Sequence, residues 1–157
     1  GDENLKDVQT DFLRTKQSVV LQESVLFTDT LRNNLLAAKP DATDKEIRRA
    51  CKNASIDTFI DSLDQGLDTM LAESGSSLSS GEKQRIGLAR AFLHDGDILL
   101  LDEPTSNLDA LNEGTILRAL DEEAKGKTVV LISHRKGTLS FADHIIEMEE
   151  LHSHAVQ

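Results

Sequence analysis

The most informative segment of this chain is LSSGEKQRIGLARAFL, residues 78–93. Ser79 and Glu82 have the spacing of a capping box, in which each side chain satisfies a free backbone N–H at the start of a helix. A helix N-terminus carries partial positive charge, and Ser80 and Gly81 are small enough to let an anion approach the backbone. The stretch predicts either an ordinary capped helix or an anion-binding helix end, and the residues downstream favour the second.

An apolar run that ends in two carboxylates follows this helix. Residues 97–101, DILLL, predict a fully buried strand, and Asp102 and Glu103 come directly after it. Carboxylates at the C-terminal end of a parallel strand suit a magnesium ion and a water molecule that must be activated beside a phosphate. The acidic pair therefore indicates phosphate chemistry at one edge of a sheet.

Two further β-branched runs predict buried strands, one at 17–22 (QSVVLQ) and one at 128–132 (TVVLI). Gln22 closes the first run, and His134 follows the second. A lone glutamine or histidine at such a place is usually structural. If the strands are parallel, both residues lie at the same sheet end as Glu103, where a neutral amide can ligate magnesium and orient a water molecule.

The remaining pattern is mostly helical. Between residues 28 and 71 no strand is expected, and Thr43 and Glu46 form a second capping box. The other predicted elements are a helix over about 110–124 capped by Asp109, a short helix around 139–142 and a strand over 144–148.

Composition narrows the class of protein. A chain of 157 residues with 38% hydrophobic content predicts one globular domain. The net charge of −11 argues against a nucleic-acid-binding surface, which needs clustered Lys and Arg. The single cysteine, Cys51, permits no internal disulfide and is expected to be a small core residue. No apolar run approaches the roughly 20 residues that span a bilayer.

Several motifs together resemble those of an ATP-binding-cassette (ABC) ATPase of the exporter type. LSSGEKQR resembles the signature motif, ILLLDEP the Walker B motif and SNLD the D-loop. Gln22 resembles the Q-loop glutamine and His134 the H-loop histidine. The resemblance implies an α/β fold, a P-loop NTPase-like core with a mostly parallel sheet and an inserted α-helical subdomain. The implied divisions are a core lobe over 1–27 and 79–148, a helical subdomain over 28–78 and a tail over 149–157.

The same resemblance implies a role for each motif residue. Glu103 would polarise the attacking water, His134 would contact the γ-phosphate of ATP, and Asp102 and Gln22 would hold Mg²⁺. The signature residues would clamp ATP bound to the opposite subunit, and they are Leu78, Ser79, Ser80, Gly81 and Glu82. The D-loop residues would be Ser106, Asn107, Leu108 and Asp109. Ser80 and Glu82 depart from the usual Gly and Gln of the signature, and Asn107 departs from the commoner Ala of the D-loop.

One family motif is not found in the sequence. A phosphate-binding loop needs the pattern G-x-x-x-x-G-K-[ST] between a strand and a helix, and 1–157 contains no such segment. Gly126-Lys127-Thr128 imitates its end but enters a predicted strand. We therefore expect the chain to begin inside the domain, to lack a central strand with its covering helix, and to be inactive as a segment on its own.

The resemblance also implies partners and a location. These are a second ABC ATPase domain in a head-to-tail dimer, the transmembrane domain of a transporter, and the cytoplasmic face of a membrane. No nucleic acid partner is expected. Two alternatives remain: the C-terminal lobe of a chromosome-maintenance or repair ATPase of the SMC class, and a non-catalytic remnant or regulatory domain. Gln22 and the helical block argue against the first, and the lack of a phosphate-binding loop supports the second.

Overall fold

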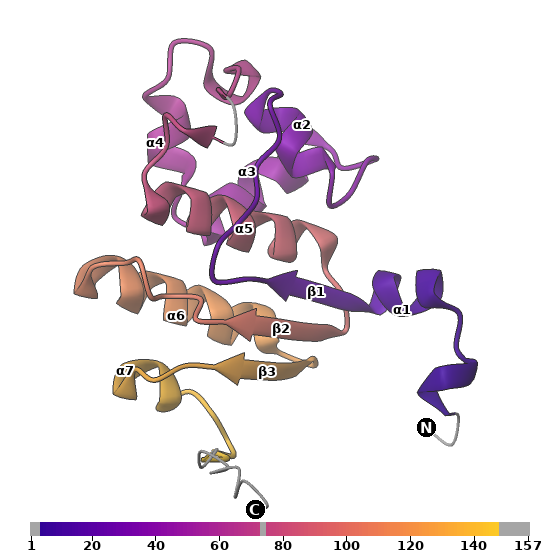
Figure 1. The fold of residues 1–157 in the computed structure, drawn as a ribbon. Coiled ribbons are helices and arrows are strands. Elements are labelled where there is room, and N and C mark those ends of the chain that lie inside the picture. Colours follow the sequence, from indigo (N-terminus) through magenta and orange to yellow (C-terminus); the bar gives the residue numbers. More distant parts are fainter. Residues whose placement is uncertain (1–3, 73–74, 148–157) are drawn as a thin grey trace, which may run out of the picture.

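The computed structural model of the chain describes residues 4–72 and 75–147, and its described strands form one parallel sheet (Figure 1). The strands are β1 (Gln17–Val20), β2 (Ile98–Asp102) and β3 (Thr128–Ile132), in the order β1-β2-β3. Both pairings are parallel, so that Val19, Leu100 and Val130 lie side by side across the sheet. The predicted α/β class with a parallel sheet is therefore confirmed.

Helices lie beside the sheet, and those that the chain forms between β1 and the central helix α5 make a separate group (Figure 1). That group contains α2 (Leu31–Leu36), α3 (Asp44–Asn53), α4 (Asp57–Asp61) and the 3₁₀-helix η2 (Gly66–Asp68). The other helical elements are η1 (Leu5–Asp7), α1 (Thr10–Lys16), α5 (Ser80–His94), α6 (Ala110–Ala124) and α7 (Lys136–Leu139). None of the described helices is long and apolar enough to cross a membrane.

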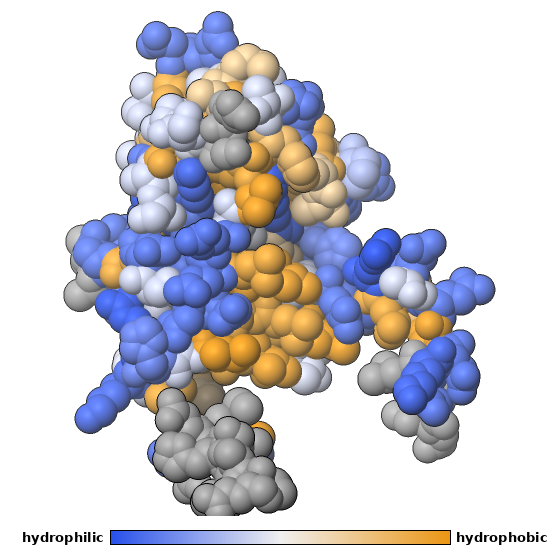
Figure 2. All heavy atoms as spheres, in the orientation of Figure 1, coloured by the Kyte–Doolittle hydropathy of each residue, from blue (hydrophilic) through white to orange (hydrophobic). Residues whose placement is uncertain are grey.

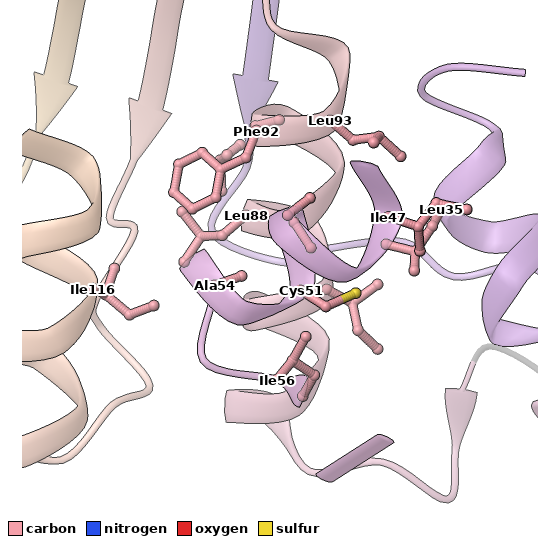
Figure 3. Close-up of a cluster of buried hydrophobic side chains, with 14 of the residues drawn as sticks. Leu35, Ile47, Cys51, Ala54, Ile56, Leu88, Phe92, Leu93 and Ile116 are labelled. Atoms are coloured by element: carbon pink, nitrogen blue, oxygen red, sulfur yellow. The ribbon is translucent and has the colours of Figure 1, made fainter. Parts of the chain in front are cut away.

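The largest part of the core lies where α5 meets α3, and Figure 3 shows this cluster. Leu88 of α5 is fully buried, and Ile47 and Cys51 of α3 are almost fully buried in the same cluster. Burying one such aliphatic side chain typically stabilises a fold by about 1.5–3 kcal/mol. Cys51 is thus a core residue, as expected, and burial raises the pKa of its thiol to about 12. This packing holds α5 against α3.

The two faces of the sheet differ sharply in burial. Val20, Leu99 and Leu101 point into the core beside α5. On the opposite face Val130 is 51% exposed, and Val19 and Ile132 are exposed to a similar degree. Figure 2 shows apolar side chains gathered over the strands on that side. We call the surface formed by Val19, Val130 and Ile132 the open sheet face.

Three sequence predictions need correction. The run 128–132 forms a strand as predicted but is not buried, because β3 is the last described strand of the sheet and one of its faces is uncovered. Residues 144–147 form no strand, since their apolar side chains find no described surface to pack on, and Met148 lies outside the described residues. The short helix is α7, which begins at Lys136, earlier than predicted.

Some residues of the chain lie outside the part that the structure describes. Glu73 and Ser74, between the helical group and α5, lie outside the described residues, as do residues 1–3 and the tail 149–157. Between residues 28 and 71 the described chain contains helices and one isolated antiparallel bridge, between Thr30 and Met70.

Candidate functional site

The capping box predicted at the start of α5 is present. The Ser79 hydroxyl accepts a hydrogen bond from the Glu82 backbone N–H at 3.3 Å, and the Glu82 carboxylate accepts from the Ser79 backbone N–H at 2.7 Å. The Ser79 hydroxyl also donates to the Glu82 Oε2 atom at 2.8 Å. Ser79 and Ser80 are exposed, and Gly81 is half-buried. The N-terminus of a long helix is therefore presented at the surface.

Glu103 and His134 form a close pair beyond the carboxyl ends of β2 and β3. The Oε1 atom of Glu103 accepts from the His134 backbone N–H at 3.1 Å and lies 2.7 Å from His134 Nδ1. An ionised carboxylate only accepts, so we assign the shared proton to Nδ1, which leaves Nε2 of a neutral imidazole as an acceptor. The Ser133 hydroxyl lies 3.4 Å from the other carboxylate oxygen. The structure thus brings together two residues that are far apart in the sequence.

The backbone of Glu103 has an uncommon conformation. Its φ of 47° lies in the left-handed region, which costs a residue with a side chain about 1–2 kcal/mol. The Glu103 N–H donates to the Ile132 carbonyl at 2.9 Å, and the Ser106 N–H donates to the Glu103 carbonyl at 3.1 Å. This turn directs the Glu103 side chain toward the loop after β3, where His134 lies.

Asp102 and Gln22 lie at the same end of the sheet as Glu103. Asp102 is the last residue of β2 and is paired with Ile132, and its side chain is partly exposed. Gln22 lies two residues beyond the end of β1, in an exposed bend rather than in the strand, because the ladder with β2 ends at Val20. One carboxylate and one amide oxygen fit Mg²⁺, which usually takes one or two protein ligands besides phosphate oxygens and water. The described residues contain no group of three His, Cys, Asp or Glu side chains that could hold a metal ion.

The D-loop segment 106–109 connects β2 to α6 and packs against α5. Leu108 is buried, and Asp109 caps α6 by accepting from the Asn112 backbone N–H at 2.9 Å. A Cβ atom at Gly81 would lie only 3.2 Å from the Asn107 carbonyl oxygen. The glycine therefore permits the start of α5 to lie closely against the D-loop.

The sequence analysis missed Gln84, which links α5 to the turn after β2. Its side chain is 1% exposed, and its Nε2 atom donates to the Glu103 carbonyl at 2.8 Å and to the Ser106 hydroxyl at 3.3 Å. Its Oε1 atom accepts from the Asn107 backbone N–H at 3.2 Å. One signal was available: Gln84 shares helical spacing with the buried residues Leu88 and Ala91.

A second group that was not predicted from the sequence is a polar cluster around Arg135. Arg135 donates to the Thr105 carbonyl at 2.5 Å and pairs with the Glu113 carboxylate at 3.1 Å. The buried hydroxyls of Thr105 and Thr138 lie 3.1 Å apart. This cluster fixes the loop after β3, including His134, to the D-loop and to α6.

A third group joins α5 to the segment that follows Gln22. The Arg90 guanidinium donates to the carbonyl and the side-chain oxygen of Asn34, each at 2.7 Å, and to the Val25 carbonyl at 2.6 Å. Burial lowers the pKa of Arg90. Long-range contacts of this kind leave no local pattern in a sequence, and no prediction singled out Arg90 or Asn34.

The chain is similar to known proteins over most of its length. Residues 1–106 match the family model described as ABC transporter. The chain is 48% identical over 147 residues to a "Probable ABC transporter ATP-binding/permease protein" of Haemophilus influenzae, which covers 94% of this chain and 27% of that protein. A solved structure, "Structure of a bacterial Atm1-family ABC exporter with ATP bound", is 39% identical with a TM-score of 0.83, over 87% of this chain and 24% of that one. The chain thus spans about a quarter of the length of the relatives it matches.

Proposed function

Since this chain belongs to the ABC transporter family, we propose that it forms part of an ATP-hydrolysing domain that powers transport across a membrane, in an exporter. The observation that carries this proposal is the pairing of Glu103 with His134 next to Asp102 at the end of the sheet. The loop that follows, at Asn107, lies against Gly81 at the start of α5. Similarity to an ATP-binding/permease protein and to an ABC exporter supports the same conclusion.

The catalytic roles that we propose are those implied by the resemblance, and the positions of Glu103 and His134 support them. Glu103 would accept the proton of the attacking water, and the Nδ1–H of His134 would hold the carboxylate in place. To contact a phosphate oxygen, which only accepts, the imidazole would also have to carry a proton on Nε2. Asp102 and Gln22 would hold the magnesium ion. When bound, Mg²⁺ supplies positive charge that offsets the charge on the transferred phosphoryl group. The protein's contribution is chiefly positioning and charge stabilisation.

The signature segment, Leu78–Glu82, would act on a nucleotide held by a second domain. Its helix end is exposed to an anion that approaches from outside this chain. The Ser79 hydroxyl donates to the Glu82 carboxylate in this structure, and it would exchange that bond for one to a phosphate oxygen, beside the Gly81 N–H. We propose a head-to-tail dimer in which each domain closes the nucleotide site of the other. Segment 106–109 lies against Gly81 and would form part of the same contact.

The proposed division of the chain follows the sequence analysis. Residues 1–27 and 79–148 would form the core lobe, 28–78 the helical subdomain that meets the transmembrane domain, and 149–157 a tail. The domain would lie on the cytoplasmic face of the membrane. The segment 1–157 contains no phosphate-binding loop pattern, so we propose that it does not hydrolyse ATP by itself. A non-catalytic role remains the second candidate, favoured by that same observation.

The test is ATP-dependent association with a complete partner. The chain is mixed with the complete ATP-binding domain of the Haemophilus influenzae relative, whose own catalytic carboxylate has been neutralised, with and without Mg-ATP. We expect analytical ultracentrifugation to show a heterodimer only when ATP is present. In a separate assay, the chain alone should release phosphate no faster than the background rate. Association to the same extent with and without ATP would favour the non-catalytic role. Turnover by the chain alone that disappears in Glu103→Gln would contradict the proposed inactivity of the segment.

A further inference from the structure

Gln84 is an amide buried within an otherwise apolar side of α5. A buried amide is costly unless its donors and acceptor are paired, and the bonds that pair it here all go to one short segment. They join Gln84 to the Glu103 carbonyl, the Ser106 hydroxyl and the Asn107 N–H. A methionine would fill a similar volume without these bonds. The amide therefore serves the turn after β2 rather than the packing of α5.

The turn needs such support because Glu103 is in the left-handed region. Conformations of this kind persist only where neighbouring structure determines them. The Ile132 carbonyl holds the N–H side of Glu103 at 2.9 Å, and Gln84 holds the carbonyl side at 2.8 Å. With both sides fixed, the side chain reaches the Nδ1 atom of His134. Gln84 thus contributes to the direction of the Glu103 carboxylate without touching it.

The same helix that carries Gln84 also carries the exposed, capped end formed by Ser79 and Glu82. Ser79 caps α5, and Gln84 follows about one and a half turns later on a single rigid element. Gly81 lies between them, in close approach to the Asn107 carbonyl. The start of α5 and the turn that contains Glu103 and Asn107 are thus joined by direct contacts.

We propose that Gln84 is a positioning residue that couples the signature end of α5 to the catalytic carboxylate of the same chain. Closure of Ser79 and Gly81 on a nucleotide held by the partner domain would, through Gln84, set the orientation of Glu103 at this chain's own site. The two sites of the dimer would then communicate through one buried amide. This inference rests on the proposed function for its consequence in catalysis, although the mechanical link can be measured without nucleotide.

The experiment compares Gln84→Met, Gln84→Glu and the exposed control Gln65→Met in the full chain. Amide hydrogen exchange at Asn107 and the NMR shifts of the His134 ring are recorded, and thermal unfolding reports the fold. Gln84→Met should raise exchange at Asn107 by about fivefold, as the loss of one hydrogen bond typically does, and should move the His134 ring resonances. Gln84→Glu keeps an acceptor for Asn107 but replaces the donor to Glu103, so His134 should move while Asn107 stays protected. Gln65→Met should change neither.

A purely structural role would lower the unfolding temperature in Gln84→Met while the His134 resonances of the folded chain stay in place, and that result would overturn the proposal. If Gln84→Met does not fold, Gln84→Glu provides the test. Faster amide exchange at Asn107 with unchanged His134 ring resonances in that variant would also overturn the proposal. A second arm repeats the ATP-dependent association with both variants. Failure of the parent chain to associate counts against the proposed function alone. Association by Gln84→Met with an unchanged ATP dependence, where the parent associates, would show that α5 is not coupled through Gln84.

Discussion

The Nδ1 atom of His134 lies 2.7 Å from the Oε1 atom of Glu103, and the two side chains differ greatly in exposure. The carboxylate is 13% exposed and the imidazole 81% exposed. The pair therefore presents the histidine ring to solvent and keeps the carboxylate close beneath it. Under the proposed function, a phosphate that enters from solvent would meet the imidazole first. The attacking water would then lie beside the pair, because the two side chains are in direct contact.

Glu103→Gln should preserve nucleotide binding and abolish cleavage. The amide keeps the shape of the side chain but cannot accept the proton of the attacking water, so turnover should fall at least about 100-fold. The measurement uses a chimera in which the part of the Haemophilus influenzae ATP-binding/permease protein that precedes the matched region is joined to this chain, and it compares phosphate release with retained ATP. Dimers with uncleaved ATP should accumulate. Hydrolysis at the parent rate would show that Glu103 is not the catalytic carboxylate.

Elements with a local signal were predictable from the sequence. The strand at 98–102 and the helix at 110–124 were found because an apolar run, an acidic pair and the cap Asp109 mark them within a few residues. The burial of β3 was not predictable, since it depends on what covers the sheet rather than on the strand. Within the site, Glu103 and His134 were both named in advance. Gln84 was not: its helical spacing with Leu88 and Ala91 indicates burial, but its hydrogen-bond partners lie 19 to 23 residues away and leave no pattern in the sequence.

The open sheet face should cause the chain to self-associate. Val19, Val130 and Ile132 expose adjacent apolar area, and the outer edge of β3 pairs with no described strand. Val130→Lys should therefore shift the chain toward monomer in analytical ultracentrifugation at micromolar concentration. Ile146→Lys, at an exposed site beyond the sheet, is the matched control and should change little. An ideal monomer with a cooperative, high thermal transition in the parent chain would contradict this prediction.

Glu46 should make folding sensitive to acid. Its bonds to Lys39 and to the capping residue Thr43 lower its pKa from 4.5 to about 2. Because the folded-state pKa is depressed, this stabilisation is present above about pH 4.5 and is lost as the pH falls toward 2. Between these values the free energy of unfolding should fall less steeply with acidification in Glu46→Gln than in the parent chain. The group is solvent-exposed, so the difference should be small and should shrink in high salt.

Denaturant titrations at several pH values measure this difference directly. The parent and the variant share every other carboxylate, so the difference between their slopes isolates Glu46. Equal slopes between pH 4.5 and 2 would show that the pKa of Glu46 is not lowered in the folded chain.

Ser79 offers the sharpest test of the signature segment, because the chain contains a matched helix end. Thr43 caps α3 with the same reciprocal bonding to Glu46 that Ser79 has with Glu82. Loss of either cap should destabilise the fold by about 1 kcal/mol, as capping residues typically do. Only Ser79, however, belongs to the surface that we propose for nucleotide bound by the partner domain. Substitutions at the two positions therefore separate a helix-capping effect from a phosphate-binding effect.

Ser79→Ala should weaken ATP-dependent association with the complete partner domain, and Ser79→Arg should abolish it. A charge-assisted hydrogen bond is worth about 1.5–3 kcal/mol, so the ATP concentration needed for association should rise roughly tenfold or more in Ser79→Ala. Thr43→Ala and Thr43→Arg should leave that concentration unchanged, although they remove an equivalent cap. The arginine adds bulk at the helix end where the phosphate oxygens must approach the Gly81 N–H. If Ser79→Arg associates as readily as the parent chain, the exposed end of α5 does not clamp a phosphate and the non-catalytic role becomes the better explanation.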